Sequence, residues 1–223
     1  MQSFRAFRIH QEAGKIVSRM ETIGLNDLAE GEVVVKVRYS TINYKDVLAA
    51  TGAGKILRRY PLVGGIDLSG EVVSSSDPQF QPGQKVLVTG SELSETRDGG
   101  YAEYARLKSD SVVPIPAGLD EFQAMAIGTA GYTAALAIHR MEQNGQQPGD
   151  GEIVVTGATG GVGSIAVDML AARGYRVVAV TGKQASVDYL QRLGAVRVLL
   201  RDQINPGSRP LEEAQFAGAI DNV

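Results

Sequence analysis

A glycine-rich stretch in the second half of the chain has the composition and spacing of a phosphate-binding turn. Residues 153–156 are the β-branched run Ile-Val-Val-Thr, which predicts a strand buried on both faces. The run Gly-Ala-Thr-Gly-Gly-Val-Gly at 157–163 leads into residues 163–174, where apolar side chains recur at helical spacing before a final glycine. A strand, a glycine turn and a helix in this order direct free backbone N–H groups and a positive helix end at a pyrophosphate.

The same glycines match a dinucleotide fingerprint, G-x-G-x-x-G, with Ala158 in the first glycine position. Gly160 would let the backbone approach the phosphates, and Gly163 would let the helix pack closely against the strand. A glycine pattern alone is weak evidence, but its place between a predicted strand and a predicted helix favours a nucleotide site over an empty turn. The residues expected at the diphosphate are Thr159, Gly160, Gly161 and Val162.

The end of the next predicted strand, residues 175–183, indicates which dinucleotide is bound. An acidic residue about 20 residues past the glycine turn would bind the ribose 2′-hydroxyl of NAD, but no Asp or Glu stands there. Thr181, Gly182 and Lys183 offer a hydroxyl, an open backbone and a cation, which suits the 2′-phosphate of NADP. Arg201, after the following predicted strand, could add a second cation. Both cations could instead be solvated loop charges.

The elements that position this turn belong to the second of two predicted regions. Residues 1–122 are β-rich and predict a small barrel, whereas helical spacing begins near residue 122 and strands and helices then alternate. A helix over 44–50, with Asn43 as its N-cap and Asp46 at its third position, is expected within the barrel region. The expected strands cover 32–39, 70–73, 85–88, 99–105, 112–115, 153–156, 175–183 and 196–200, and the expected later helices cover 122–126, 133–141, 163–174 and 185–193.

We therefore predict an α/β chain with a substrate domain at 1–122 and the first half of a nucleotide-binding domain at 123–223. A doubly wound dinucleotide fold has six parallel strands in the order 3-2-1-4-5-6. The chain supplies three of them and begins a fourth at 218–223 before it ends. We expect the wall beside the nicotinamide to be missing, so that this chain alone shows no turnover and at best weak adenosine-side binding.

Composition limits the classes of function. The net charge of −3 gives no reason to expect nucleic acid or an anionic membrane as a partner. Residues 1–10 lack the apolar core of a signal peptide and no apolar run approaches a membrane span, so we expect a cytoplasmic protein. The chain has no cysteine, and its two histidines, His10 and His139, are far apart in sequence. Disulfides and a three-ligand zinc site are therefore excluded.

Five motifs in this order resemble the medium-chain dehydrogenase/reductases: Asn43-Tyr-Lys-Asp46, Gly65-Ile-Asp-Leu-Ser-Gly70, Gly99-Gly-Tyr-Ala-Glu103, Gly128-Thr-Ala-Gly-Tyr-Thr133 and Val155-Thr-Gly-Ala-Thr-Gly-Gly-Val-Gly163. More narrowly, the chain resembles the zinc-free quinone oxidoreductase branch, in the subgroup that contains NADPH-dependent acrylyl-CoA reductases. The resemblance implies a GroES-like β-barrel domain, a Rossmann domain and a cleft between them. It also implies NADPH as cofactor, and it leaves a homodimer open for the intact protein.

The resemblance also implies roles for individual residues. Asn43 and Asp67 match polar residues that face the active-site cleft. In the zinc alcohol dehydrogenases of this family, the segment aligned with 65–70 carries a His-Glu pair whose His binds the metal; Ile66 and Asp67 stand there instead. The residues that match NADPH-contacting positions are Tyr44, Thr159, Gly160, Gly161, Val162, Thr181, Gly182, Lys183 and Arg201.

Loss of the metal favours reduction of an activated alkene, because alcohol oxidation in this family relies on zinc to stabilise an alkoxide. Hydride addition to the β-carbon places charge on a carbonyl oxygen, which hydrogen-bond donors can stabilise. The Asn43 amide and the Tyr44 hydroxyl are candidate donors, to the substrate or to the cofactor ribose. The proton for the α-carbon would come from water or from a nearby acid, for which Asp67 is a candidate. Asn43 could equally be only a helix cap, and Asp67 could bond only local backbone.

The function expected first is NADPH-dependent reduction of a short α,β-unsaturated acyl-CoA such as acrylyl-CoA. The alternatives are quinone or enone reduction by the same hydride chemistry, and a non-catalytic NADPH-binding protein. Lys55, Arg58 and Arg59 form a small basic cluster that could meet the phosphates of coenzyme A, although such clusters are commonly solvated surface charges.

Overall fold

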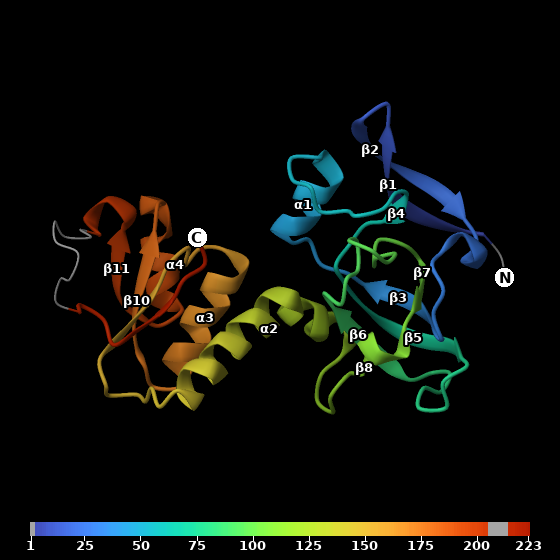
Figure 1. Cartoon of the computed structure of the whole chain (residues 1–223). Coiled ribbons are helices and arrows are strands. Elements are labelled where there is room, and N and C mark those ends of the chain that lie inside the picture. Colours follow the sequence, from blue (N-terminus) through green and yellow to red (C-terminus); the bar gives the residue numbers. More distant parts are fainter. Residues whose placement is uncertain (1–2, 205–213) are drawn as a thin grey trace. The chain divides into compact units, whose positions relative to one another are not determined.

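The computed structural model describes residues 3–204 and 214–223 and divides the chain into two compact units (Figure 1). Unit 1 is Met1–Thr129 and unit 2 is Ala130–Val223. Both this division and the predicted boundary between residues 122 and 123 lie within helix α2 (Glu121–Gln143), which is interrupted at Gly128. None of the helices in the described ranges is long and apolar enough to cross a membrane.

Unit 1 is built from antiparallel strands. One sheet has the order β7-β3-β5-β6-β8 and the other has the order β2-β1-β4. Alternate residues of β3, Val33 and Val35, are fully buried and pack with Leu68 and Val86 of the next strands, as the period-2 pattern predicts. The elements are β1 (Phe4–Glu12), β2 (Lys15–Ile23), β3 (Val33–Tyr39), α1 (Tyr44–Thr51), β4 (Leu62–Val63), β5 (Asp67–Ser75), β6 (Lys85–Thr89), β7 (Tyr104–Leu107) and β8 (Val113–Pro114).

The strand predicted at 99–105 is wrong over its first half, because β7 begins only at Tyr104. Gly99 and Gly100 run against the backbone before β5 and not along a strand. A Cβ atom on Gly99 would lie 2.1 Å from the carbonyl oxygen of Gly65, and one on Gly100 would lie 2.3 Å from that of Asp67. Only glycine permits this approach, so the alternating pattern marks a crossing of two backbones.

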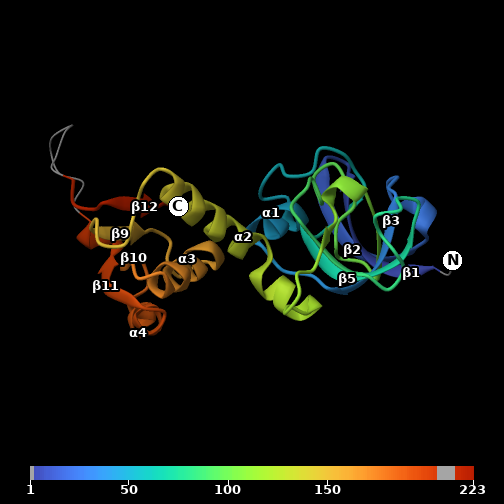
Figure 2. The same cartoon turned by 90° about the horizontal axis from the view of Figure 1, so that it is seen from below.

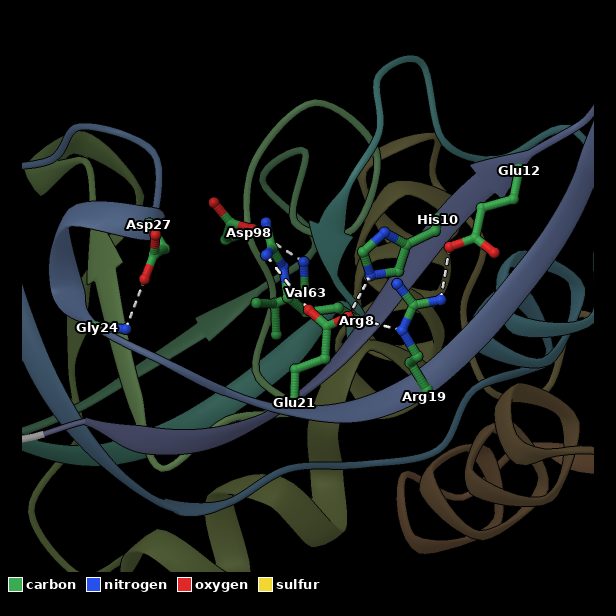
Figure 3. A network of polar contacts seen from close by, with 9 residues as sticks. All are labelled: Arg8, His10, Glu12, Arg19, Glu21, Gly24, Asp27, Val63 and Asp98. Carbon is green, nitrogen blue, oxygen red and sulfur yellow. Dashed lines mark hydrogen bonds and ion pairs between the residues drawn. The ribbon is translucent and has the colours of Figure 1, made fainter.

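The hairpin of β1 and β2 carries a polar network on one face (Figure 3). Arg19 donates to Glu12 at 2.6 Å and to Glu21 at 2.7 Å, and His10 Nε2 lies 2.9 Å from Glu21 Oε1. The same view shows Asp98, a buried carboxylate that accepts a hydrogen bond from the backbone N–H of Val63 in β4 at 2.9 Å. The alternation of His10 and Glu12 along β1 places both side chains opposite the charges of β2.

Unit 2 is a parallel sheet in the order β11-β10-β9-β12, the order of the first four strands of a doubly wound fold (Figure 2). This confirms the predicted fold class. Alternate strand residues Ile153, Val155, Val177 and Ala179 pack in one core with α3, α4 and the second half of α2. The elements are β9 (Glu152–Val155), α3 (Gly161–Ala172), β10 (Arg176–Thr181), α4 (Val187–Arg192), β11 (Ala195–Leu200) and β12 (Gly218–Ile220).

Two helices of unit 2 differ from the predicted ranges. Helix α3 begins at Gly161, two residues before the predicted start, so that the last glycines of the turn already have helical geometry. The helix predicted at 185–193 is divided into a 3₁₀ turn, Gln184–Ser186, and α4. Its predicted end is correct, because Gly194 follows with a φ of +100°, a conformation that glycine adopts without strain.

Gly163→Ala should destabilise unit 2. A Cβ at this position would lie 2.4 Å from the carbonyl oxygen of Gly157 and 2.8 Å from the Cα of Ala158, so α3 would have to move away from β9. We expect the free energy of unfolding to fall by about 1–3 kcal/mol, the usual cost of overpacking. Urea denaturation followed by circular dichroism measures this change.

Gly161→Ala is the matched control. A Cβ at Gly161 would have its nearest neighbour, the Ala130 side chain, at 3.3 Å. We expect a loss less than half that of Gly163→Ala. Equal midpoints and slopes for the two variants would contradict the close approach of α3 to the end of β9.

Candidate functional site

A pocket of about 440 Å³ lies at the carboxyl edge of the parallel sheet in unit 2. Residues that directly follow β9, end β10 or follow β11 contribute to it, and this edge is where open α/β sheets bind ligands. It brings together five of the residues predicted to bind cofactor. The lining residues are Thr156, Gly157, Thr159, Val180, Thr181, Gly182, Lys183, Arg201, Ile204, Asp221 and Val223.

The glycine turn beside this pocket presents backbone N–H groups without acceptors. Gly157 has a φ of +54°, and Ala158 N–H donates to the carbonyl of Val180 at 3.0 Å, which fixes the turn to β10. Among the described residues, no acceptor is recorded for the N–H groups of Thr159, Gly161 and Val162. The first N–H groups of a helix have no carbonyl of their own to bond. The turn therefore keeps the donors that an anion needs.

Gly160 is the exception among the four predicted turn residues. It is the N-cap of α3, and its own N–H donates to the carbonyl of Gly157 at 2.9 Å. The side-chain-free face of Gly160 is exposed, so an anion can approach the turn there. Its place in the site is thus steric, and the N–H donors come from its neighbours.

Two cations lie on the same pocket. Lys183 and Arg201 are both exposed, and an atom added at the Cβ position of Gly182 would lie 3.8 Å from Nη2 of Arg201. Neither cation has an ion-pair partner in the part of the chain that the structure describes. The Thr181 hydroxyl accepts the N–H of Lys183 at 3.1 Å and thereby shapes the loop. An anionic group in this pocket would face two positive charges, neither of them ion-paired with a described carboxylate, together with the Asp221 carboxylate, which also lines the pocket.

Sequence reasoning missed a second polar group at this edge. The Thr156 hydroxyl donates to the Asp221 carboxylate, and it accepts the N–H of Asn222 at 2.9 Å. These residues follow β9 and β12, which pair in parallel, so their side chains meet at the same edge. The signal was available, since a polar residue directly after each of two strands predicts this meeting once the strand order is known.

In unit 1 the organising side chain is Asp67, at the start of β5. Its carboxylate is fully buried. Oδ2 accepts hydrogen bonds from the Thr41 hydroxyl at 2.6 Å, from Nδ2 of Asn43 at 3.0 Å and from the N–H of Thr129 at 3.1 Å. Oδ1 accepts the Thr129 hydroxyl. All four partners are donors, which is the arrangement that satisfies a buried ionised carboxylate.

Asn43 occupies the N-cap of α1, as predicted, and its backbone N–H donates to Asp46 Oδ2 at 2.8 Å. Its side-chain amide also forms hydrogen bonds. Nδ2 donates to the Thr41 hydroxyl at 2.8 Å and to Asp67 at 3.0 Å, with Asp46 Oδ2 at 3.3 Å. The amide hydrogens, which were candidate donors to the substrate or to the cofactor ribose, are therefore directed at protein acceptors.

Tyr44, the first residue of α1, is 80% exposed. The donor groups at this end of α1 therefore differ in availability. The Tyr101 hydroxyl donates to the carbonyl of Thr41 at 2.8 Å. Burial, followed by the nearby Asp46 carboxylate, raises the pKa of Tyr101 well above its usual range, so this phenol stays protonated. Tyr44 is the aromatic hydroxyl at this place that solvent reaches.

An apolar pocket of about 370 Å³ lies along α1, from Ile42 before the helix to Ala50 in its last turn. It is lined by Phe7, Ile42, Val47 and Ala50, with Asp46 and Tyr101 as the polar members. The basic cluster predicted from sequence is exposed, and Arg59 lies 3.8 Å from the Asp98 carboxylate. No three His, Asp or Glu side chains within residues 3–204 and 214–223 are arranged to hold a metal ion.

Comparison with known proteins identifies the family of this chain. Residues 29–117 match the model of the alcohol dehydrogenase GroES-like domain. The chain is 51% identical over 219 residues to an Escherichia coli (strain K12) protein named as a probable acrylyl-CoA reductase, AcuI. It is 49% identical over 221 residues to YhfP of Bacillus subtilis (strain 168), whose name assigns it provisionally to the quinone oxidoreductases. The two alignments cover 98% and 99% of this chain, and 67% of each relative.

Solved structures give the same result for the fold. The crystal structure of E. coli K-12 YhdH with bound NADPH superposes with a TM-score of 0.94 at 51% identity. That of the B. subtilis protein YhfP with NAD bound superposes with a TM-score of 0.94 at 48% identity. Each alignment covers 98% of this chain and 67% of the solved chain. The chain therefore spans about two thirds of the length of these relatives, and it belongs to the medium-chain dehydrogenase/reductase family.

Proposed function

We propose that the protein is a zinc-independent reductase that uses NADPH to reduce the activated C=C bond of a short α,β-unsaturated acyl-CoA, such as acrylyl-CoA. The observation that carries this proposal is the pocket of unit 2, where two cations lie beside a glycine turn whose N–H groups at Thr159, Gly161 and Val162 have no recorded acceptor among the described residues. The name of the E. coli relative supports the substrate, and the NADPH in the E. coli YhdH structure supports the cofactor.

The residues of unit 2 fit such a cofactor. The N–H groups of Thr159, Gly161 and Val162 would hold the diphosphate, with Gly160 allowing its approach, and Lys183 and Arg201 would pair with the 2′-phosphate beside Thr181 and Gly182. Bound NADPH would supply the hydride. The YhfP structure holds NAD. In this chain we attribute the preference for NADPH to Lys183 and Arg201.

The residues of unit 1 suggest how the substrate is activated. We propose that the Tyr44 hydroxyl, which is exposed, donates a hydrogen bond to the carbonyl oxygen of the substrate. The Asn43 amide hydrogens are already bonded to protein acceptors. Asn43 and Asp67 then act by holding the first turn of α1. A direct proton transfer from Asp67 to the substrate remains a prediction. The four hydrogen bonds that the Asp67 carboxylate accepts favour a structural role over proton transfer. The apolar pocket beside α1 suits a short acyl chain.

The second candidate is quinone or enone reduction by the same chemistry, which the name of the B. subtilis relative favours. A non-catalytic NADPH-binding protein is the third. NADPH oxidation by the full-length protein with acrylyl-CoA, a quinone and a simple enone separates them. We expect the highest kcat/KM with the thioester; higher values with the quinone would replace the first candidate by the second. A cytoplasmic location and a homodimer remain predictions from the sequence and the family.

Lys183→Ala should weaken binding of 2′,5′-ADP to this chain about tenfold, because a charge-assisted contact to the 2′-phosphate is lost. Binding of 5′-ADP, which lacks that phosphate, should stay unchanged. Isothermal titration calorimetry measures both, and neither ligand requires the nicotinamide side of the site. The control is Lys15→Ala, an exposed lysine of unit 1 in β2. An equal loss for the two ligands would remove Lys183 from the 2′-phosphate site.

Tyr44→Phe should lower kcat for acrylyl-CoA in the full-length protein by about 10- to 100-fold, the scale expected for one donor to a developing oxyanion. Circular dichroism should be unchanged because Tyr44 is exposed. Tyr189→Phe is the matched control, since Tyr189 is also exposed and lies on α4. A kcat within twofold of the parent would show that the Tyr44 hydroxyl does not stabilise the enolate.

A further inference from the structure

The break in α2 lies against the buried carboxylate of unit 1. Gly128 has φ 50° and ψ −163°, a conformation that interrupts the helix and that side-chain-bearing residues avoid. A Cβ on Gly128 would lie 3.1 Å from the Thr41 side chain and 3.2 Å from Asp67 Oδ2. The glycine thus allows the chain to run directly against the Asp67 carboxylate, and Thr129 follows at the last position of unit 1.

Thr129 binds that carboxylate twice. Its N–H donates to Oδ2 at 3.1 Å and its hydroxyl donates to Oδ1. The same Oδ2 accepts a hydrogen bond from Nδ2 of Asn43 at 3.0 Å, and Asn43 directly precedes Tyr44 in the chain. A carboxylate is a planar group, so a donor on Oδ1 restricts its rotation and with it the position of Oδ2.

Three hydrogen bonds fix the segment before Asn43 near Asp67. The Ser40 hydroxyl donates to the carbonyl of Asp67 at 2.6 Å, and the Thr41 hydroxyl donates to the Asp67 carboxylate at 2.6 Å. Tyr101 donates to the carbonyl of Thr41 at 2.8 Å. Asp67 is therefore the common acceptor for the start of α1 and for the end of unit 1.

We propose that Thr129 is a positioning residue of the reductase: by holding Asp67 it sets the direction of the Asn43 side chain and of the first turn of α1, which carries Tyr44. The device joins the helix break at Gly128, where the chain passes into unit 2, to the donor that acts on the substrate. This inference rests on the proposed function for its effect on catalysis. The link from Thr129 to Asn43 is independent of that function.

Thr129→Val tests the link. Valine keeps the shape and the backbone N–H but removes the hydroxyl from Oδ1, so the Asp67 carboxylate gains freedom to rotate. In ¹H–¹⁵N spectra of this chain, we expect the Asn43 side-chain NH₂ signals, assigned by their loss in Asn43→Ala, to shift and to exchange faster with water. Thr129→Ser should restore both. Thr51→Val is the matched control, because the Thr51 hydroxyl donates to Val47 within α1 itself.

The catalytic consequence is measured in the full-length protein. We expect Thr129→Val to lower kcat for acrylyl-CoA on the order of tenfold, as small misplacements of reacting groups do. Affinity for 2′,5′-ADP should stay unchanged, because its predicted site lies wholly in unit 2, and this also shows that the variant is folded.

Unchanged Asn43 signals in Thr129→Val would overturn the proposal, whatever the activity. Shifted signals with an unchanged kcat, in a protein whose Tyr44→Phe variant is slow, would overturn it as well. If Tyr44→Phe also keeps full activity, the proposed chemistry fails, and the spectra alone then decide whether Thr129 positions Asn43.

Discussion

The first turn of α3 contains backbone N–H groups that no carbonyl of its own helix can reach, and the diphosphate contacts proposed for this protein depend on them. Their availability is a consequence of packing. Gly163 lets the helix lie against the end of β9, with 2.4 Å between a hypothetical Cβ and the carbonyl of Gly157. The bond from Ala158 to Val180 fixes the turn to β10. A side chain at Gly163 would move the helix and the donors together.

A second constraint organises unit 1. A buried carboxylate is costly unless donors surround it, and Asp67 has four. Those donors come from the segment before α1 and from Thr129, directly after the break in α2. The requirement to satisfy one carboxylate therefore holds Asp67 to a residue that is 62 positions away in the chain. The position of the first turn of α1 follows from electrostatics more than from the capping preference of Asn43.

The sequence predicted what local pattern encodes. The β-branched runs marked β9, β10 and β11, and the glycine fingerprint placed the turn between β9 and α3. It could not predict contacts that depend on how distant segments pack, such as the bond between Thr129 and Asp67. It also gave no signal for the β1–β2 hairpin, where charged residues on one face conceal the alternation. The crossing at Gly99 and Gly100 was mistaken for a strand because a close backbone approach and a weak strand share the same composition.

The position of Asp67 bears on how this family can work without zinc. The resemblance to the zinc alcohol dehydrogenases implies that Ile66 and Asp67 stand where those enzymes carry a His-Glu pair whose His binds the metal. Ile66 is buried, and its N–H donates to Asp46 at 3.0 Å. Both carboxylate oxygens of Asp67 accept hydrogen bonds from protein donors. The segment that contains Ile66 and Asp67 therefore has a structural role. The charge that develops on the substrate must then be stabilised by N–H or O–H donors. This requirement is easier to satisfy for a delocalised enolate than for a localised alkoxide, which is why the geometry of unit 1 favours alkene reduction over alcohol oxidation.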